Sequence, residues 1–209
     1  MLLPKPYLKA ILNQEPGQAY RACLDLLGAD NSPDRPSTQE IVYGCEIQFA
    51  LQALTEGKLD RLYNFGDLDG RGSRLMWSVL DPRPSSRVCF LGAGPFPVTA
   101  LLLRQRYPQA RVTCLENDLT GFLIGREVCR VLQCEVDFLY QDAHQADLSE
   151  FEVIVMAAMV GDRHTLVEKL LRETRAELVV RGSLSFTDPR VHTVASDFDE
   201  TGQVSSKKS

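Results

Sequence analysis

The fold is decided by one stretch of the sequence, Val88-Cys89-Phe90-Leu91-Gly92-Ala93-Gly94-Pro95-Phe96-Pro97-Val98-Thr99. A run of apolar residues leads directly into a Gly-x-Gly turn, and a helical pattern over 98–107 follows the turn. This order of strand, turn and helix is typical of a nucleotide-binding α/β sheet. Gly92 and Gly94 allow a tight turn and a close approach to a ligand. Pro97 stands where most dinucleotide fingerprints have a third glycine, and a proline fits the first turn of a helix. The stretch therefore predicts a short, rigid turn suited to a small adenosine ligand.

Strand and helix patterns alternate from Arg87 onward. Apolar runs predict strands at 88–91, 111–115, 136–140, 153–156 and 178–181, with helices at 98–107, 119–132 and 165–174. Near-continuous apolar strands separated by helices are typical of a parallel sheet that is covered on both faces. The predicted fold class is therefore α/β, with a Rossmann-like sheet that binds its ligand at the carboxyl ends of the strands.

The first 80 residues have a helical character instead. A capping box, Ser37-Thr38-Gln39-Glu40, predicts the start of a long helix over 41–54 that carries one apolar stripe. A linker rich in Pro and Ser, at 81–86, separates this part from the sheet. We expect a helical N-terminal cap domain at 1–80, a Rossmann-like ligand-binding domain at 81–196 and a polar tail at 197–209.

Composition excludes several classes of protein. The net charge of -5 over 209 residues gives no electrostatic case for nucleic-acid binding. The longest apolar runs, such as 153–160, are too short to span a bilayer, and the start has no apolar core of signal-peptide length. The six cysteines form no Cys-x-x-Cys pair, and the three histidines lack metal-ligand spacing. We expect a cytoplasmic protein with no metal site and no nucleic-acid or membrane partner.

The residues that directly follow each strand should converge at one edge of the sheet. An acid after the second strand commonly accepts hydrogen bonds from ribose hydroxyls, which is the role expected of Glu116. Asp142, after the third strand, is placed to meet an adenine amino group, and Ala157 and Ala158 leave space for a ligand after the fourth. Each has a plainer interpretation: Glu116 and Asp118 as loop acids or helix caps, Asp142 as the start of a turn, the alanines as close packing.

The kind of adenosine ligand follows from charge. A dinucleotide brings a pyrophosphate, which favours helix-terminal amides and basic support, and the Gly-x-Gly turn contains no basic residue. S-adenosylmethionine brings no phosphate, and its sulfonium cation tolerates an acidic, aromatic mouth. The sequence therefore favours S-adenosylmethionine over NAD.

Several motifs together resemble those of the nicotianamine synthase family. The turn from Gly92 to Thr99 is similar to that family's Gly-x-Gly-Pro-x-Pro-x-Thr turn. The run Val153-Ile154-Val155-Met156-Ala157-Ala158-Met159-Val160-Gly161, with Glu168-Lys169 after it, resembles a second signature, and Leu115-Glu116-Asn117-Asp118 resembles an acidic segment. The likeness covers roughly residues 38–190. The length resembles that of the short bacterial members, which make opine-type metallophores.

The resemblance implies a class I S-adenosylmethionine-dependent transferase sheet and an aminobutyrate transferase. Such enzymes move the 3-amino-3-carboxypropyl group of S-adenosylmethionine, their co-substrate, to an amine such as histidine and release methylthioadenosine, here in metallophore biosynthesis. The residues expected to bind the co-substrate are Gly92, Ala93, Gly94, Pro95, Glu116, Asn117, Asp142, Ala143, Ala157 and Ala158.

Catalysis requires a neutral acceptor amine, so a carboxylate base is expected nearby. Tyr43 and Glu46 lie at i and i+3 on one helix face, and Tyr43-Gly44-Cys45-Glu46 resembles the family's N-terminal helix that carries an active-site Glu. We therefore predict Glu46, with Tyr43, as the catalytic pair, although an acid on a helix is often surface decoration. Tyr63 and Arg181 are the candidates for substrate binding, Arg181 through a carboxylate.

The sequence also departs from the family pattern in the segments expected to form the acceptor pocket. Met76 stands where an acid is expected, and 183–189 is shorter than the corresponding family segment. Two alternatives therefore stay open. One is an ordinary methyltransferase that releases adenosylhomocysteine, and the other is a binding module without chemistry. A small-molecule amine or amino acid is the expected partner, and a homodimer is possible.

Overall fold

A parallel sheet forms the centre of the protein in the computed structural model, which describes residues 11, 13–26, 38–57, 86–182 and 184–194. Its strands are β1 (Arg87–Leu91), β2 (Arg111–Glu116), β3 (Asp137–Tyr140), β4 (Val153–Met156), β5 (Glu177–Arg181) and β6 (Val191–Val194). They lie in the order β3-β2-β1-β4-β5-β6, which is a doubly wound order of nucleotide-binding sheets. The α/β, Rossmann-like fold class predicted from the sequence is confirmed.

The register of the central strands defines one edge at which the site can form. Leu91, the last residue of β1, pairs with Leu115 of β2 on one side and with Met156 of β4 on the other. These strands therefore end at nearly the same level. All residues of β4 are buried, as are all those of β1 after Arg87, which is the reason for their continuous apolar character.

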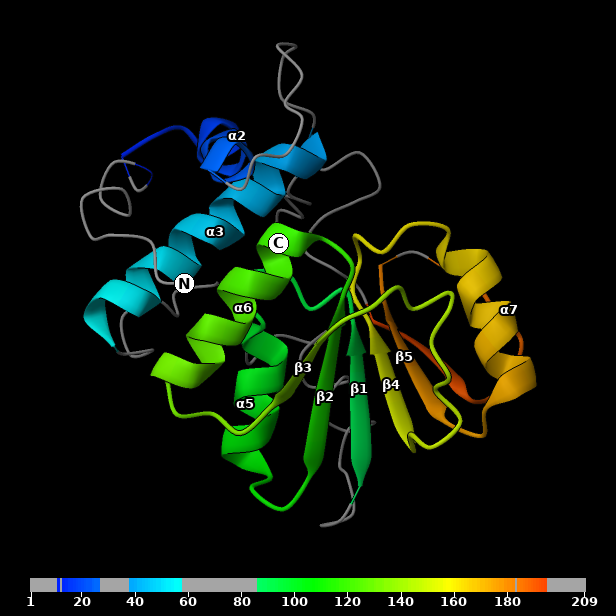
Figure 1. The fold of residues 1–209 in the computed structure, drawn as a ribbon. Helices are drawn as coiled ribbons and strands as arrows, with labels where there is room; N and C mark the ends of the chain where they lie inside the picture. Colours follow the sequence, from blue (N-terminus) through cyan, green and yellow to red (C-terminus); the bar gives the residue numbers. More distant parts are fainter. Residues whose placement is uncertain (1–10, 12, 27–37, 58–85, 183, 195–209) are drawn as a thin grey trace, which may run out of the picture.

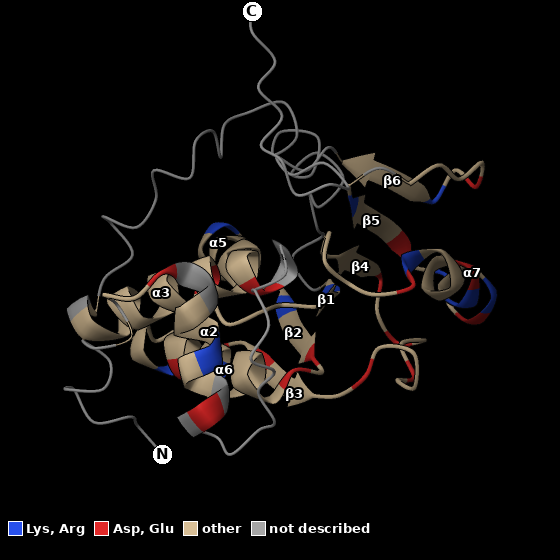
Figure 2. Ribbon diagram, turned by 90° about the horizontal axis from the view of Figure 1, so that it is seen from above, with Lys and Arg blue, Asp and Glu red and all other residues tan. Residues whose placement is uncertain are grey.

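Helices cover both faces of the sheet (Figure 1). The helices are α2 (Pro16–Leu26), α3 (Thr38–Glu56), α5 (Val98–Arg106), α6 (Leu119–Val131) and α7 (Arg163–Glu173). Figure 2 shows α5 and α6 on one face, with α2 and α3 beyond them, and α7 on the opposite face. The core divides accordingly: α2, α3, α5 and α6 share one buried cluster with the sheet, and α7 shares the other with the segment after β3. Helix α3 packs against α6, so the N-terminal helices share the core on this face of the sheet.

Strand β6 was not predicted. It lies parallel to β5, yet the described part of the connection, residues 182 and 184–190, contains no helix, whereas parallel neighbours usually need a helical crossover. Two contacts hold this connection against α7. The Arg190 guanidinium donates to the carbonyls of Leu171 and Thr174 at 3.1 and 2.9 Å, and the rings of His164 and Phe186 stack with centroids 4.8 Å apart.

Most ends of the other predicted elements lie within one residue of those in the structure. Strand β4 has the predicted bounds, and β5 begins one residue earlier than predicted. Helix α3 begins at Thr38 and not at Ile41, and α7 begins two residues before Thr165. Several predictions lie outside the described residues: the domain boundary near residue 80, the linker 81–86 except for Ser86, Tyr63, Met76 and the tail 197–209. None of the described helices is long and apolar enough to cross a membrane.

Candidate functional site

The turn after β1 requires glycine at two positions. Gly92 and Gly94 have φ values of +69° and +68°, in the left-handed region that other residues rarely adopt. Pro95, Phe96 and Pro97 after them are buried, and α5 begins at Val98. The turn predicted from the sequence therefore adopts a left-handed backbone at both glycines, and its prolines are buried beside them.

The protein's own oxygens take up the consecutive amides of this turn. Gly92 and Ala93 both donate to the Leu115 carbonyl, at 3.0 and 3.2 Å. Gly94 donates to Glu116 Oε2 at 2.7 Å. A pyrophosphate is normally held by free amides at such a turn, and these three amides already have partners within the protein.

Glu116 is the buried acid at the end of β2, with 4% of its surface exposed. Its second oxygen accepts a hydrogen bond from the Asp118 amide at 2.8 Å. Burial raises the pKa of the Glu116 carboxyl, while the amide donors of Asp118 and Gly94 act in the opposite direction. The Glu116 carboxyl group at the end of β2 thus binds the turn that follows β1.

Asp118 serves as the N-cap of α6. Its Oδ1 accepts from the Gly121 amide at 2.8 Å, and its Oδ2 accepts from the Tyr20 hydroxyl at 3.2 Å. Asn117, between the two acids, is exposed. The cap interpretation that the sequence left open for Asp118 is therefore the one that the structure shows.

Glu46 reaches this turn from α3. A Cβ atom added to Gly94 would lie 2.5 Å from Glu46 Oε2, so the carboxyl group rests directly against the turn. Burial, and to a smaller extent the Glu116 charge, raise the pKa of Glu46 to about 8, while the positive charge of Arg181 opposes this rise. The structure therefore brings together Glu46, Gly94 and Glu116, which come from three separate segments, and the charge of Arg181 acts on the Glu46 carboxyl.

Tyr43 lies one turn earlier on the same helix, and its hydroxyl is buried without a hydrogen-bond partner in the described structure. A Cβ atom on Gly121 would collide with this hydroxyl and would lie 3.1 Å from Glu116 Cγ. Tyr43 therefore meets α6 beside Glu116. Leaving a buried polar group unpaired costs about 1–3 kcal/mol, so this hydroxyl is an energetic liability in the free protein.

The loop after β4 covers the other side of the turn. The Ala157 amide donates to the Leu91 carbonyl at 3.0 Å. A Cβ atom on Gly92 would lie 3.6 Å from Ala157 Cβ and 2.6 Å from Val160 Cγ2. Ala158 is half-buried and Met159 is exposed. The turn is thus enclosed by α3 on one side and by this loop on the other.

Asp142 and Ala143 follow β3, where an adenine is expected. Asp142 Oδ1 accepts from the His144 amide at 2.9 Å, and its carbonyl accepts from Gln145 and Ala146 at 3.1 Å each. Asp142 therefore starts a turn, as its plainer interpretation had it, and it stays half-exposed at the edge of the sheet. Ala143 is buried beneath it.

Arg181 ends β5 at the same edge. Its carbonyl accepts from Arg163 Nη1 at 2.7 Å. Its half-buried side chain has no ion pair or hydrogen bond within the residues that the structure describes. A guanidinium in this position is available to a carboxylate. Tyr63, the other candidate for substrate binding, is outside the described residues.

Sequence reasoning missed three residues that shape this site: Val160, Gly121 and Gly125. A Cβ atom on Gly125 would lie 2.7 Å from the Gly94 carbonyl oxygen and from the Phe138 ring. Two glycines four residues apart lie on the same face of a helix, and this spacing could have predicted that another segment packs closely against that face. The position of Val160 over Gly92 had no such signal, because it depends on how the loop folds back.

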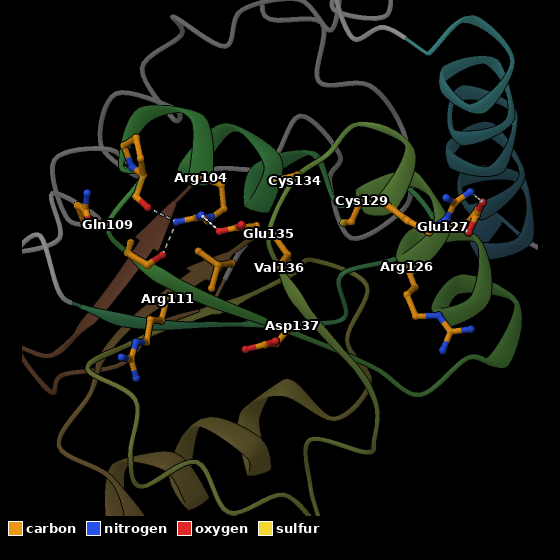
Figure 3. A pocket seen from close by; sticks show the side chains of 14 residues that line it. Arg104, Gln109, Arg111, Arg126, Glu127, Cys129, Cys134, Glu135, Val136 and Asp137 are labelled. Atoms are coloured by element: carbon orange, nitrogen blue, oxygen red, sulfur yellow. Dashed lines mark hydrogen bonds and ion pairs between the residues drawn. The ribbon is translucent and has the colours of Figure 1, made fainter.

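A hollow of about 840 Å³ lies elsewhere, among the ends of α5 and α6 and the starts of β2 and β3 (Figure 3). Most of the charged groups drawn there are bound to one another: Arg104 pairs with Glu135 at 3.2 Å, and Arg130 pairs with Glu127. Arg111, the first residue of β2, marks this as the amino edge of the sheet. Ligands of such sheets bind at the opposite edge, so the hollow is separate from the candidate site. Within the described ranges, no cluster of His, Cys, Asp and Glu could hold a metal ion.

Comparisons with known proteins find a family and solved structures to which the chain is similar. A family model described as nicotianamine synthase protein matches residues 72–187, more than half of the chain. A mutant of the crystallised protein MtNAS matches with a TM-score of 0.56 and 19% identity, over 82% of this chain and 62% of that one. MtNAS in complex with MTA and tNA gives 0.56 and 18%, over 81% and 61%. The mutant in complex with S-adenosylmethionine gives 0.50 and 17%, over 83% and 79%.

These structural likenesses, at less than a fifth identity, concern the fold. The chain spans about 62% of the length of the first of these structures. No curated protein matches the sequence significantly.

Proposed function

The chain belongs to the nicotianamine synthase family, and on that premise we propose that it is an S-adenosylmethionine-dependent aminobutyrate transferase. In this reaction an acceptor amine attacks the γ-carbon of the 3-amino-3-carboxypropyl group. A nitrogen–carbon bond forms, the carbon–sulfur bond breaks, and its electron pair stays on the sulfur of methylthioadenosine. The acceptor nitrogen then loses a proton to the protein.

One observation carries the choice of co-substrate. The amides of Gly92, Ala93 and Gly94 all donate hydrogen bonds to oxygens of Leu115 and Glu116. A dinucleotide would need such amides for its pyrophosphate, whereas S-adenosylmethionine has no phosphate. Two acidic side chains, Glu46 and Glu116, border the turn, which suits a sulfonium cation. The MtNAS mutant crystallised with S-adenosylmethionine has the same fold and supports this assignment.

The carboxyl edge of the sheet offers a place for each part of this co-substrate. We assign the ribose to Glu116 and Asn117, and the adenine to Asp142 and Ala143. The sulfonium and the group to be transferred are assigned to the Gly92–Pro95 turn, between Glu46 on one side and Ala157 and Ala158 on the other.

Glu46 is the proposed general base. A carboxyl group with an ordinary pKa near 4.5 is a poor acceptor for a proton from an ammonium group whose pKa is about 8–10. The Glu46 pKa of about 8 lies much nearer to that range, and a base works best when its pKa is matched to the task. The same carboxyl rests against Gly94, where the reacting carbon is placed by this proposal.

Arg181 is the proposed partner of a substrate carboxylate. The transferred group carries one, and an amino-acid acceptor carries another. The Arg181 charge acts on Glu46, so a carboxylate bound to Arg181 would lie near the proposed base. Together the two side chains favour a small zwitterionic acceptor, such as histidine, and a role in metallophore biosynthesis in the cytoplasm.

The products of one incubation test this function. The purified protein is mixed with S-adenosylmethionine and a pool of amino acids, and the products are read by mass spectrometry. We expect methylthioadenosine and an acceptor that is heavier by one aminobutyrate group. Adenosylhomocysteine would instead identify a methyltransferase. Calorimetric binding of S-adenosylmethionine without any product would identify a binding module.

A further inference from the structure

The orphaned hydroxyl of Tyr43 points to a ligand contact. In the described residues, only Tyr43 Oη and Arg104 Nε are buried side-chain polar atoms without a hydrogen-bond partner. Arg104 is otherwise engaged, with Ala110, Pro108 and Glu135. Tyr43 has no such compensation. Buried polar groups nearly always have a partner, so a buried hydroxyl without one calls for a partner that the free chain does not supply.

The surroundings of this hydroxyl belong to the ribose end of the proposed site. Tyr43 meets α6 at Gly121, where Glu116 Cγ also lies. The neighbouring carboxylates that raise the pKa of Tyr43 most, after burial itself, are Glu116 and Asp118, and Glu46 follows them. The two acids after β2 therefore act on the Tyr43 hydroxyl more strongly than the proposed base does.

We propose that Tyr43 is a ribose-binding residue, whose hydroxyl bonds with a ribose hydroxyl of the adenosyl ligand beside Glu116. This inference rests on the proposed function, because it takes the adenosyl ligand from it. It also moves Tyr43 away from the catalytic role that its place near Glu46 on the helix suggests.

The hydrogen-bond chemistry of this arrangement is complete. A ribose hydroxyl can accept the Tyr43 proton and donate its own proton to a carboxylate. Glu116 can accept that donor, because its Oε2 accepts from the Gly94 amide and its Oε1 from the Asp118 amide, and an ionised carboxylate offers about four lone-pair sites. One ribose hydroxyl would therefore satisfy the orphaned phenol and extend the network around Glu116.

Tyr20 provides a matched control. Its ring contacts the Tyr43 ring edge-on, with centroids 5.1 Å apart, and both residues belong to the N-terminal helices. The Tyr20 hydroxyl, however, already donates to Asp118. Removal of the two hydroxyls should therefore have opposite consequences for the free protein.

The test compares Tyr43→Phe and Tyr20→Phe by thermal unfolding without ligand. Tyr43→Phe should keep or raise the Tm, since it removes an unpaired polar atom, whereas Tyr20→Phe should lower it. Titration calorimetry then measures the Kd of methylthioadenosine and of its 2′-deoxy and 3′-deoxy analogues. For methylthioadenosine, Tyr43→Phe should raise the Kd about tenfold (about 1.4 kcal/mol). For one of the two deoxy analogues, wild type and Tyr43→Phe should bind equally.

Three results would overturn the inference while the wild type binds methylthioadenosine: an unchanged Kd in Tyr43→Phe, an equal loss with all three ligands, or a drop in Tm as large as that of Tyr20→Phe. A wild-type protein that binds none of the three ligands would instead overturn the proposed function, and the inference with it.

Discussion

The burial of Glu46 leads to a prediction about the pH dependence of stability, which can be tested without substrate. Its carboxyl has a pKa raised from 4.5 to about 8 in the folded protein. The folded state therefore holds the proton more tightly than the unfolded chain does. The stabilisation from this bound proton is complete below pH 4.5 and is lost as the pH rises toward 8. Glu46→Gln keeps the size of the side chain but has no proton to lose.

The magnitude follows from the size of the shift. A rise from 4.5 to about 8, at about 1.36 kcal/mol for each pKa unit, sets a ceiling of about 5 kcal/mol. Relaxation around the charge and water penetration reduce this value, so a difference on the order of 2–5 kcal/mol is expected. The stability of Glu46→Gln relative to wild type should therefore improve by that amount between pH 4.5 and pH 9.

Urea unfolding of both proteins at half-unit pH steps measures this difference directly. Glu15→Gln serves as the control, because the Glu15 side chain is exposed just before α2 and water solvates its charge in both states. A difference between Glu46→Gln and wild type that stays constant over the whole pH range would refute the burial of this carboxyl against the turn.

The sequence predicted the sheet well because the signal there is local. Strand β4 is buried along its whole length, so the apolar run that follows Glu152 marks where the strand begins. The Gly-x-Gly-Pro-x-Pro turn was likewise predictable, because Gly92 and Gly94 are the residues that adopt its left-handed backbone without strain. Strand β6 was not predicted, since it is only four residues long, is largely half-buried and follows a connection whose described residues form no helix.

The site was less predictable, because its contacts join distant segments. Glu46 and Gly94 are 48 positions apart, and their approach depends on how α3 packs outside α6. Both oxygens of Glu116 accept from backbone amides, of Gly94 and Asp118, because β1 and β2 end at nearly the same level. Val160 covers Gly92 because the loop after β4 folds back over the turn. Helical spacing could place Tyr43 and Glu46 on one face, but it could not show that the Tyr43 hydroxyl has no partner.

Other variants test further parts of the account. The pH profile of kcat/KM should rise up to about 8, where Glu46 ionises, and Glu46→Gln should lose about two orders of magnitude in turnover; an unchanged rate would remove Glu46 from the mechanism. Arg181→Met should move that rise to higher pH, since the Arg181 charge lowers the Glu46 pKa, and should raise KM; an identical profile would separate Arg181 from the site. Gly94→Ala should destabilise the protein by about 1–2 kcal/mol from its left-handed backbone alone and weaken ligand binding, as urea unfolding and calorimetry would show; normal stability and binding would count against the turn. Gln133, just after α6, has a left-handed backbone (φ +53°) that glycine adopts without strain. Gln133→Gly should therefore stabilise the protein by about 1 kcal/mol without changing Kd, and lower stability would contradict the described helix end.

A crystal structure of the protein soaked with S-adenosylmethionine tests the central claim most directly. The adenosyl group should lie at the carboxyl edge of the sheet, with its sulfonium against the Gly92-Ala93-Gly94 turn and its ribose beside Glu116. Electron density that leaves this turn empty, or that places the ligand in the arginine-lined hollow at the amino edge, would contradict the account.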